Sequence, residues 1–171
     1  MKKTDYIIEI ATSDYDTTAA AVAGGADRIE LCANLAEGGT TPSFGTIQRC
    51  REACSAAIYP IIRPRGGDFL YSDEEFDIML RDIKLCRQLG CDGVVTGILL
   101  ADGNIDISRM ARLAEAAYPL GLTFHRAFDR CLDPFKAMEQ LIGLGAERIL
   151  TSGQQSTAPE GVELITRLQE A

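Results

Sequence analysis

Short apolar runs of strand length alternate along this chain with longer stretches whose apolar residues recur at helical spacing. The clearest helical stretch covers residues 73–89, where arginines and a lysine occupy positions between the apolar ones. Its apolar positions are Phe76, Met79, Leu80, Ile83 and Cys86. Ser72 and Glu75 form a capping-box pattern at its start, and Asp133 followed by Pro134 marks the start of a later helix. The sequence therefore predicts amphipathic helices that begin after Ser72 and after Asp133.

A repeat organises the rest of the chain. In three segments Gly is followed by Ala or Cys, then Asp or Glu, then a short strand; they cover residues 25–31, 90–96 and 145–151. Further β-rich runs cover residues 6–11, 58–64 and 120–126, which gives six predicted strands. Strands that alternate with helices in this way predict a parallel sheet with right-handed crossovers.

Two α/β architectures fit this repeat, an open doubly wound sheet and a closed barrel. In the open sheet helices cover both faces, so the central strands are apolar throughout. Here polar residues instead share one face near the strand ends. The pairs are Glu30 with Cys32, Arg63 with Arg65, and Thr123 with His125. This pattern favours a TIM-type (β/α)8 barrel with its mouth at the carboxyl ends of the strands.

The chain supplies about six of the eight βα units of such a barrel, as a single, partial domain over residues 1–171 that is incomplete at its C-terminus. Six units cannot close an eight-stranded barrel, because closure fixes strand number, tilt and shear together. The first and sixth predicted strands are apolar, contain no proline and would each expose an unpaired edge. We therefore expect a fragment of a longer gene product that forms a homo-oligomer or is marginally stable.

Composition narrows the classes of partner. The net charge of −8 and the lack of a long Lys/Arg run argue against nucleic acid. No apolar stretch is long enough to span a membrane, and the first residues lack a signal-peptide core. The six cysteines form no close-spaced disulfide framework, which indicates reduced thiols in the cytoplasm. The first strand is not followed by Gly-x-Gly-x-x-Gly, so no nucleotide cofactor is expected.

Polar side chains from four predicted strands converge at the barrel mouth; they are Glu9, Glu30, Cys32, Arg63, Arg65 and His125. Adjacent strands lie ~4.8 Å apart, so Glu9 and Glu30 would be close enough for one carboxylate to raise the pKa of the other. A raised carboxyl pKa is typical of a general acid or base. The two arginines would balance that charge or clamp an anionic substrate. His125, the only histidine, is placed as a proton shuttle. The alternative is a charge-balanced polar plug inside the barrel.

Two other features have a functional and a structural interpretation. The segment 151–155, which includes Ser152, offers hydroxyls and a backbone nest for an anion, or is simply the entry to a helix. Cys50 and Cys54 are one helical turn apart, which suits either a soft metal ion or two small buried side chains. Cys32 faces the barrel interior, so it cannot join them in one metal site.

Five segments carry a resemblance to a known family: residues 24–32, 37–43, 62–72, 123–129 and 150–153. In order and over essentially the whole chain, they resemble the CutC copper-homeostasis family. The resemblance implies a TIM barrel, a cytosolic location and an association with copper handling. The mouth residues that it carries over are Glu9, Glu30, Cys32, Asn34, Arg63, Arg65, His125, Arg126 and Asp129.

These observations leave three functional hypotheses. The first is a copper-homeostasis protein that binds Cu(I) with Cys32 as its main ligand. The second is an enzyme, a lyase, isomerase or hydrolase, that acts on a small polar or anionic metabolite. Its catalytic residues would be Glu9, Glu30, His125 and Asp129, and its substrate-binding residues Asn34, Arg63, Arg65, Arg126 and Ser152. The third is a non-catalytic remnant without a site of its own.

Overall fold

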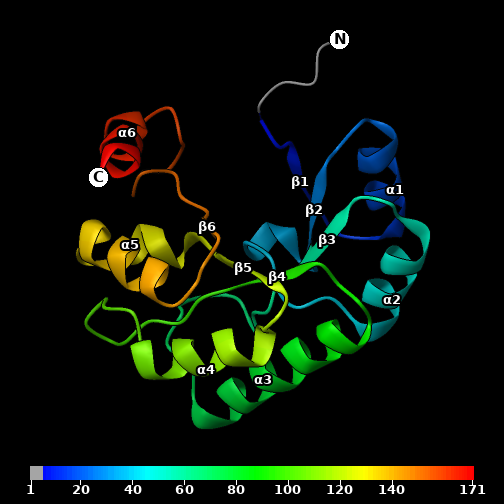
Figure 1. Ribbon diagram of the computed structural model, residues 1–171, viewed down its shortest axis with the longest axis horizontal. Helices are drawn as coiled ribbons and strands as arrows, with labels where there is room; N and C mark the ends of the chain where they lie inside the picture. Colours follow the sequence, from blue (N-terminus) through cyan, green and yellow to red (C-terminus); the bar gives the residue numbers. More distant parts are fainter. Residues whose placement is uncertain (1–5) are drawn as a thin grey trace.

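The computed structural model describes residues 6–171, and within them six strand–helix units follow one another as the repeats predict (Figure 1). The strands are β1 (Glu9–Thr12), β2 (Arg28–Leu31), β3 (Ala57–Pro60), β4 (Gly93–Thr96), β5 (Gly121–Phe124) and β6 (Arg148–Ile149). The α-helices are α1 (Tyr15–Ala23), α2 (Phe44–Ala53), α3 (Asp73–Gln88), α4 (Ile107–Ala117), α5 (Pro134–Gly143) and α6 (Val162–Glu170). Two short 3-10 helices, η1 (Leu35–Glu37) and η2 (Arg126–Arg130), follow β2 and β5.

The strands form a parallel arc with the helices on its outer side (Figure 1). β1, β2 and β3 pair in order, as do β4, β5 and β6. A bridge between Ile61 and Val95 joins the two groups, and the Ile62 N–H donates to the Val95 carbonyl at 2.7 Å. In the described part of the chain no ladder joins β1 to β6. The arrangement confirms six units of a TIM-type barrel. No helix in residues 6–171 has the length and apolar character needed to cross a bilayer.

The local signals at the helix starts are confirmed. Ser72 Oγ accepts from the Glu75 N–H at 3.2 Å, and the Glu75 carboxylate accepts from the Ser72 N–H at 2.8 Å, so the capping box is complete. Asp133 caps α5 by accepting from two backbone N–H groups, with Pro134 in the first turn. The outer strands are shorter than predicted, because β1 begins at Glu9 and β6 holds only two residues. Among residues 6–171, each of them pairs along one edge only.

The two faces of the arc have separate cores. Outward side chains such as Ile29, Leu31 and Ile58 pack under the helices in the larger core, as the alternation predicts. The smaller core lies inside the arc and consists of Cys32, Tyr59, Ile61 and Val95. Cys50 and Cys54 are buried in the larger core, so they are separated from Cys32. This agrees with their interpretation as small core residues.

Tyr59 closes the lower end of the arc interior. Its ring lies beneath the guanidinium groups of Arg28 and Arg148, at 5.0 and 5.4 Å from the ring centre. Its hydroxyl accepts from Arg148 at 3.3 Å. Gly93 and Gly121 face this side chain, and a Cβ atom added to either would overlap it. The absence of a side chain at these two positions therefore makes room for Tyr59.

We expect Gly93→Ala to lower the free energy of unfolding by about 2 kcal/mol, the usual cost of overpacking a core. The Tyr59 ring cannot move aside freely, because an arginine packs against it on β2 and another on β6. Urea unfolding measures the change. Gly45→Ala in α2 is the matched control, since its Cβ would meet no atom within 4 Å. Equal stability of the two variants would contradict the packing argument.

Candidate functional site

A cavity of about 670 Å³ lies at the carboxyl ends of the strands. Six of the ten predicted site residues line it: Glu30, Cys32, Arg63, His125, Arg126 and Asp129. Glu9, Asn34, Arg65 and Ser152 are not among its lining residues. The cavity therefore brings together β2, the loop after β3, and the segments that follow β5 and β6.

Glu30 has the most strongly altered carboxyl group of the cavity. Burial, together with the negative charge of Glu9, raises its pKa to about 7, although the positive charge of Arg28 acts in the opposite direction. Cys32 Sγ, at 4.0 Å from Glu30 Oε1, is a weak neutral neighbour. At neutral pH this carboxyl group is therefore divided between its protonated and ionised forms, and it is able to give or take a proton.

The prediction that Glu9 lines the cavity is wrong. Glu9 is the first residue of β1, in register with Arg28, and it lies one layer below Ala11, the β1 residue that lines the cavity. Arg28 Nε donates to the Glu9 carboxylate at 2.8 Å, which fixes it in an ion pair. Glu9 affects the site through its negative charge, which helps to raise the pKa of Glu30.

Cys32 lies two residues after Glu30, on the same wall. Burial raises the pKa of its thiol to about 12, and the negative charges of Glu30 and Glu9 add to the effect. The thiol is therefore protonated at neutral pH, whereas a metal ligand or nucleophile must be a thiolate. In residues 6–171, no three His, Cys, Asp or Glu side chains are grouped to hold a metal ion.

The charge of Glu30 should control the reactivity of this thiol. We expect Glu30→Gln to speed alkylation of Cys32 by iodoacetamide at pH 8.5 by about threefold or more, because losing a negative neighbour lowers the thiol pKa and each pKa unit is tenfold in thiolate. Peptide mass spectrometry measures the rate at Cys32. Glu115→Gln, at an exposed position of α4, should leave it unchanged. An alkylation rate at Cys32 that is the same in Glu30→Gln and the wild type would show that the two groups are not electrostatically linked.

Arg63 is buried and ties together the loops at the mouth. Its guanidinium donates to the carbonyls of Glu37 and Gly39 at 2.9 Å and of Gly67 at 2.8 Å. In residues 6–171 it makes no ion pair, and its Nε has no hydrogen-bond partner. Arg63 is therefore a buried cation without a carboxylate partner in residues 6–171; its guanidinium contacts backbone carbonyls and the Phe69 ring.

Arg65 and Asn34 lie outside the cavity. Arg65 Nε donates to Glu75 at 2.6 Å, and its Nη2 to Asp68 at 2.9 Å. Because β3 ends at Pro60, the strand alternation that would place Arg65 beside Arg63 no longer applies there. Asn34 adopts a left-handed backbone, φ 51°, at the start of η1, a conformation that asparagine tolerates. Both residues hold loops in place, and neither lines the cavity in which substrate contacts were predicted.

His125, predicted from the sequence as a proton shuttle, has a buried and uncharged ring in the structure. Its Nδ1 accepts from the Ala127 N–H at 3.2 Å, so in the neutral ring Nε2 carries the proton. Burial, assisted by the positive charge of Arg63, lowers its pKa to about 3. The ring is 3% exposed and lies 4.9 Å from the Phe69 ring, measured between centres. At neutral pH it is uncharged, with Nε2–H without a partner in residues 6–171.

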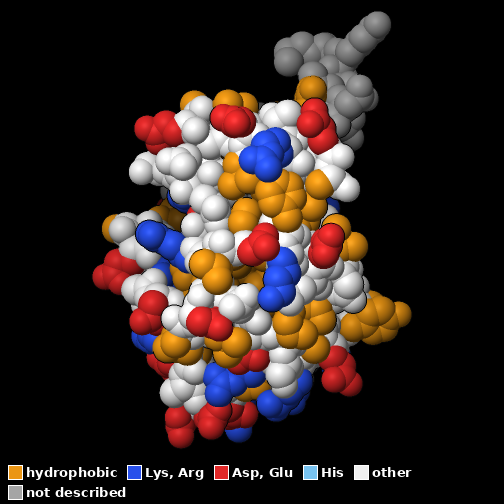
Figure 2. Space-filling model, turned by 90° about the vertical axis from the view of Figure 1, so that its left-hand side faces the viewer, with side chains coloured by type: hydrophobic (Ala, Val, Ile, Leu, Met, Phe, Trp, Pro, Cys, Tyr) orange, Lys and Arg blue, Asp and Glu red, His pale blue; other side chains and the backbone are white. Residues whose placement is uncertain are grey.

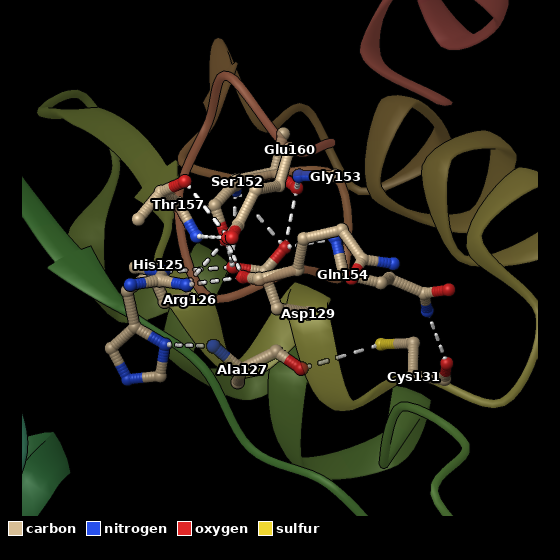
Figure 3. A network of polar contacts seen from close by, with 12 residues as sticks. His125, Arg126, Ala127, Asp129, Cys131, Ser152, Gly153, Gln154, Thr157 and Glu160 are labelled. Carbon is tan, nitrogen blue, oxygen red and sulfur yellow. Dashed lines mark hydrogen bonds and ion pairs between the residues drawn. The ribbon is translucent and has the colours of Figure 1, made fainter. Parts of the chain in front are cut away.

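Asp129 fills the anion nest that the sequence predicted after β6 (Figure 3). Its carboxylate accepts from the backbone N–H groups of Ser152 and Gln154 at 3.1 and 3.0 Å. The Thr151 and Ser152 hydroxyls and Arg126 Nε also donate to it. Burial acts to raise its pKa, but the hydrogen bonds, with those from Thr151 and Arg126 foremost, outweigh burial and hold it below its ordinary value.

The nest is thus occupied by a side chain of the protein itself. Several donors surround the Asp129 carboxylate, so it anchors the loop after β6. It also lines the cavity in which a catalytic role was predicted for it. Ser152 is held by Asp129 and accepts from Arg126, which leaves it away from the cavity surface. Arg126 lines the cavity but is paired with Asp129 at 2.8 Å.

Several lining residues were not predicted from the sequence, among them Glu37, Phe69, Arg130 and Gln154. The centre of the Phe69 ring lies 5.0 Å from the Arg63 guanidinium and 4.9 Å from the centre of the His125 ring. Its position two residues after Gly67, in a loop that follows a strand, was the available signal. Arg130 ends η2, four residues after Arg126, and no pattern in the sequence distinguishes it.

Comparison with known proteins gives one consistent family. The model of the CutC family matches residues 6–171. A family protein CutC from Bacteroides thetaiotaomicron is 55% identical over 170 residues, which cover 99% of this chain and 68% of that protein. A CutC structure from Streptococcus agalactiae, to which copper homeostasis is provisionally ascribed, is 36% identical with a TM-score of 0.91, over 96% of this chain and 81% of its own.

More distant structures share the fold alone. An aldolase that is 16% identical has a TM-score of 0.60 over 98% of this chain and 77% of its own. The chain spans 66 to 68% of the length of the first three curated relatives. Their activities as whole proteins are therefore a matter of proposal for this chain.

Proposed function

This chain belongs to the CutC family, and from that premise we propose that it binds a small anionic, oxygen-rich metabolite and moves a proton on it through Glu30. The observation that carries the proposal is a carboxyl group with a pKa near 7 on the wall of a cavity that also holds a buried, unpaired cation, Arg63. A general acid or base works best when its pKa lies near the working pH. An uncompensated buried cation favours a negatively charged ligand.

The other cavity residues have supporting roles in this proposal. Arg63 and His125 would face the reacting end of the ligand, since both are buried beside Phe69. Arg130, an exposed lining residue, would attract the ligand at the rim. Asp129 and Arg126 would hold the loop after β6 in place. The reaction class is a proton transfer at carbon, as in an isomerase or a lyase.

Deuterium exchange tests this function. A panel of small keto, hydroxy and amino acids and sugar phosphates is incubated with the chain in D2O, and proton NMR follows the loss of carbon-bound hydrogen. We expect exchange for one compound class, a loss of at least a hundredfold in Glu30→Gln, and no loss in Glu115→Gln. No exchange across the panel, or exchange that is independent of Glu30, would contradict the proposal.

Copper handling is the second candidate, favoured by the Cys32 thiol on the cavity wall and by the description of the Streptococcus agalactiae relative. The donors fit a resident copper ion poorly, because the Cys32 pKa is raised to about 12 and no group of three His, Cys, Asp or Glu side chains in residues 6–171 could hold a metal ion. Copper would therefore be a transient cargo. In an anaerobic Cu(I) titration against a chromogenic chelator, Cys32→Ser should lose one equivalent and Cys50→Ser should lose none. Identical titrations of the wild type and Cys32→Ser would contradict copper binding at Cys32.

We also propose a cytoplasmic location and self-association. All six cysteines are buried free thiols, which suits a reducing compartment. Ile7 and Ile8, just before β1, are 62 and 52% exposed, and Ile10 within β1 is 40% exposed. The second edge of β1 has no partner strand in the described residues. On the α5–α6 side, hydrophobic side chains gather between charged ones (Figure 2). Light scattering should therefore give a mass above that of the monomer; a monodisperse monomer would contradict self-association.

A further inference from the structure

Two buried hydrogen-bond donors of the cavity have no acceptor. Five buried side-chain polar atoms in residues 6–171 lack a partner, and two of them belong to residues that line the cavity, namely Arg63 Nε and His125 Nε2. Both side chains are more than nine-tenths buried, at 4 and 3% exposure. Leaving such groups without an acceptor costs on the order of 1–3 kcal/mol each, so their shared position calls for an explanation.

The same aromatic ring packs against both donors. The Arg63 guanidinium lies 5.0 Å from the centre of the Phe69 ring, and the His125 ring lies 4.9 Å from it. Phe69 belongs to the loop after β3, close to Gly66 and Gly67, and is itself only partly buried. Both donor side chains therefore pack against one ring that borders the same cavity.

The other hydrogen bonds of these residues fix the direction of the free N–H groups. Arg63 is held by three backbone carbonyls through its two Nη atoms, which leaves Nε for another acceptor. His125 accepts at Nδ1 from the Ala127 N–H, so its proton is at Nε2. Because both groups are already oriented, an acceptor would bind them without further loss of side-chain freedom. One donor is cationic and the other neutral, which suits an oxygen that carries a negative charge.

We infer that Arg63 Nε and His125 Nε2 form an oxyanion-binding pair, and that the ligand is an enolisable carbonyl compound with a carboxylate or a similar anionic group. This inference rests on the proposed function. Glu30 removes a proton from the carbon next to the carbonyl; the C–H electron pair forms a C=C bond, and the carbonyl electrons move to the oxygen. The two N–H groups stabilise the resulting enolate oxygen. Return of the proton from Glu30 to carbon completes the cycle, so no oxidant or second substrate is needed.

The position of the Phe69 ring would differ between the empty cavity and the ligand-bound cavity. Both donor atoms are buried and both side chains pack against Phe69, so a ligand oxygen would reach them only if that ring turned aside. Once it is seated, the ring excludes water from the new hydrogen bonds, which strengthens them.

Oxalate is the test probe, because it is a planar dianion that resembles the enolate of an α-keto acid. Calorimetry gives its affinity, and nitrogen-15 NMR follows the single imidazole. We expect oxalate to move the His125 Nε2–H resonance and acetate at equal ionic strength to leave it in place. His125→Leu should weaken oxalate binding at least tenfold. His125→Gln keeps an N–H near Nε2 and should stay within about threefold of the wild type.

Each outcome decides the inference. An unmoved His125 resonance, or equal binding by His125→Leu, would overturn it. If His125→Leu does not fold, the resonance and His125→Gln still decide, because loss of oxalate binding by His125→Gln would also overturn it. Glu30→Gln should bind oxalate at least as tightly as the wild type while losing deuterium exchange. If oxalate does not bind but deuterium exchange still depends on Glu30, only the oxyanion-binding pair is contradicted. If deuterium exchange does not depend on Glu30, only the proposed function is contradicted.

Discussion

At pH 8 the Glu30→Gln variant is expected to be more stable than the wild type, by as much as about 3 kcal/mol. Folding raises the pKa of Glu30 from 4.5 to about 7, and each pKa unit corresponds to about 1.4 kcal/mol. The folded state holds the Glu30 proton more tightly than the unfolded state, so this group lowers the stability of the wild type as pH rises from about 4.5 to 7. Glutamine is neutral throughout this pH range, so the variant does not lose folding stability in this way.

His125 acts in the opposite direction. Folding lowers its pKa from 6.5 to about 3, so the unfolded chain binds the proton more readily. Stability from this group is complete above pH 6.5 and is lost as pH falls toward 3. Between about pH 4.5 and 6.5 the two residues therefore oppose each other, and the wild type should show a flat profile there.

Urea unfolding at pH 8, 6.5 and 5 checks both trends in one series. Glu30→Gln should exceed the wild type at pH 8 and lose stability steadily below pH 6.5, because the effect of His125 is no longer balanced. At pH 5 the two proteins should be close. Glu115→Gln, on the exposed side of α4, should follow the wild type throughout. A Glu30→Gln variant no more stable than the wild type at pH 8 would show that Glu30 is ionised at little cost in the folded state.

The sequence was sufficient where a residue's position depends on its near neighbours. The capping box at Ser72 needs only Glu75 three residues later, and both hydrogen bonds are present. Glu30 and Cys32 share a wall because they are two residues apart across the end of one strand. The same rule failed for Arg65, because β3 ends before it and the chain turns. Alternation predicts a face only while the strand continues.

The chemistry of the site depends on contacts that the sequence does not reveal. His125 was the right residue for the cavity, but burial and the Ala127 N–H make it a neutral donor. The loop after β6 is an anion nest, as its residue types indicate, but Asp129 fills it from 23 residues away. A nest and the carboxylate that occupies it are separate signals in a sequence, and only the fold brings them together.

Replacement of Asp129 by alanine should therefore cost about 3 kcal/mol in unfolding free energy. The Asp129 side chain is 6% exposed, and its loss leaves the Ser152 and Gln154 N–H groups and Arg126 without their acceptor. Urea unfolding gives the total change. Hydrogen exchange should locate it in residues 151–154, which this carboxylate anchors, with protection there falling at least tenfold.

Asp77→Ala is the matched control, because Asp77 also pairs with an arginine, at 2.7 Å from Arg81, but is 59% exposed. Exposed pairs of this kind contribute below about 1 kcal/mol, so the difference between the two variants measures what burial and the backbone donors add. The vacated nest should also accept an oxyanion, and inorganic phosphate is expected to restore part of the protection in Asp129→Ala without affecting the wild type. If Asp129→Ala lost no more stability than Asp77→Ala, the loop after β6 would have to be held by its own turns, and the cavity wall would not depend on Asp129.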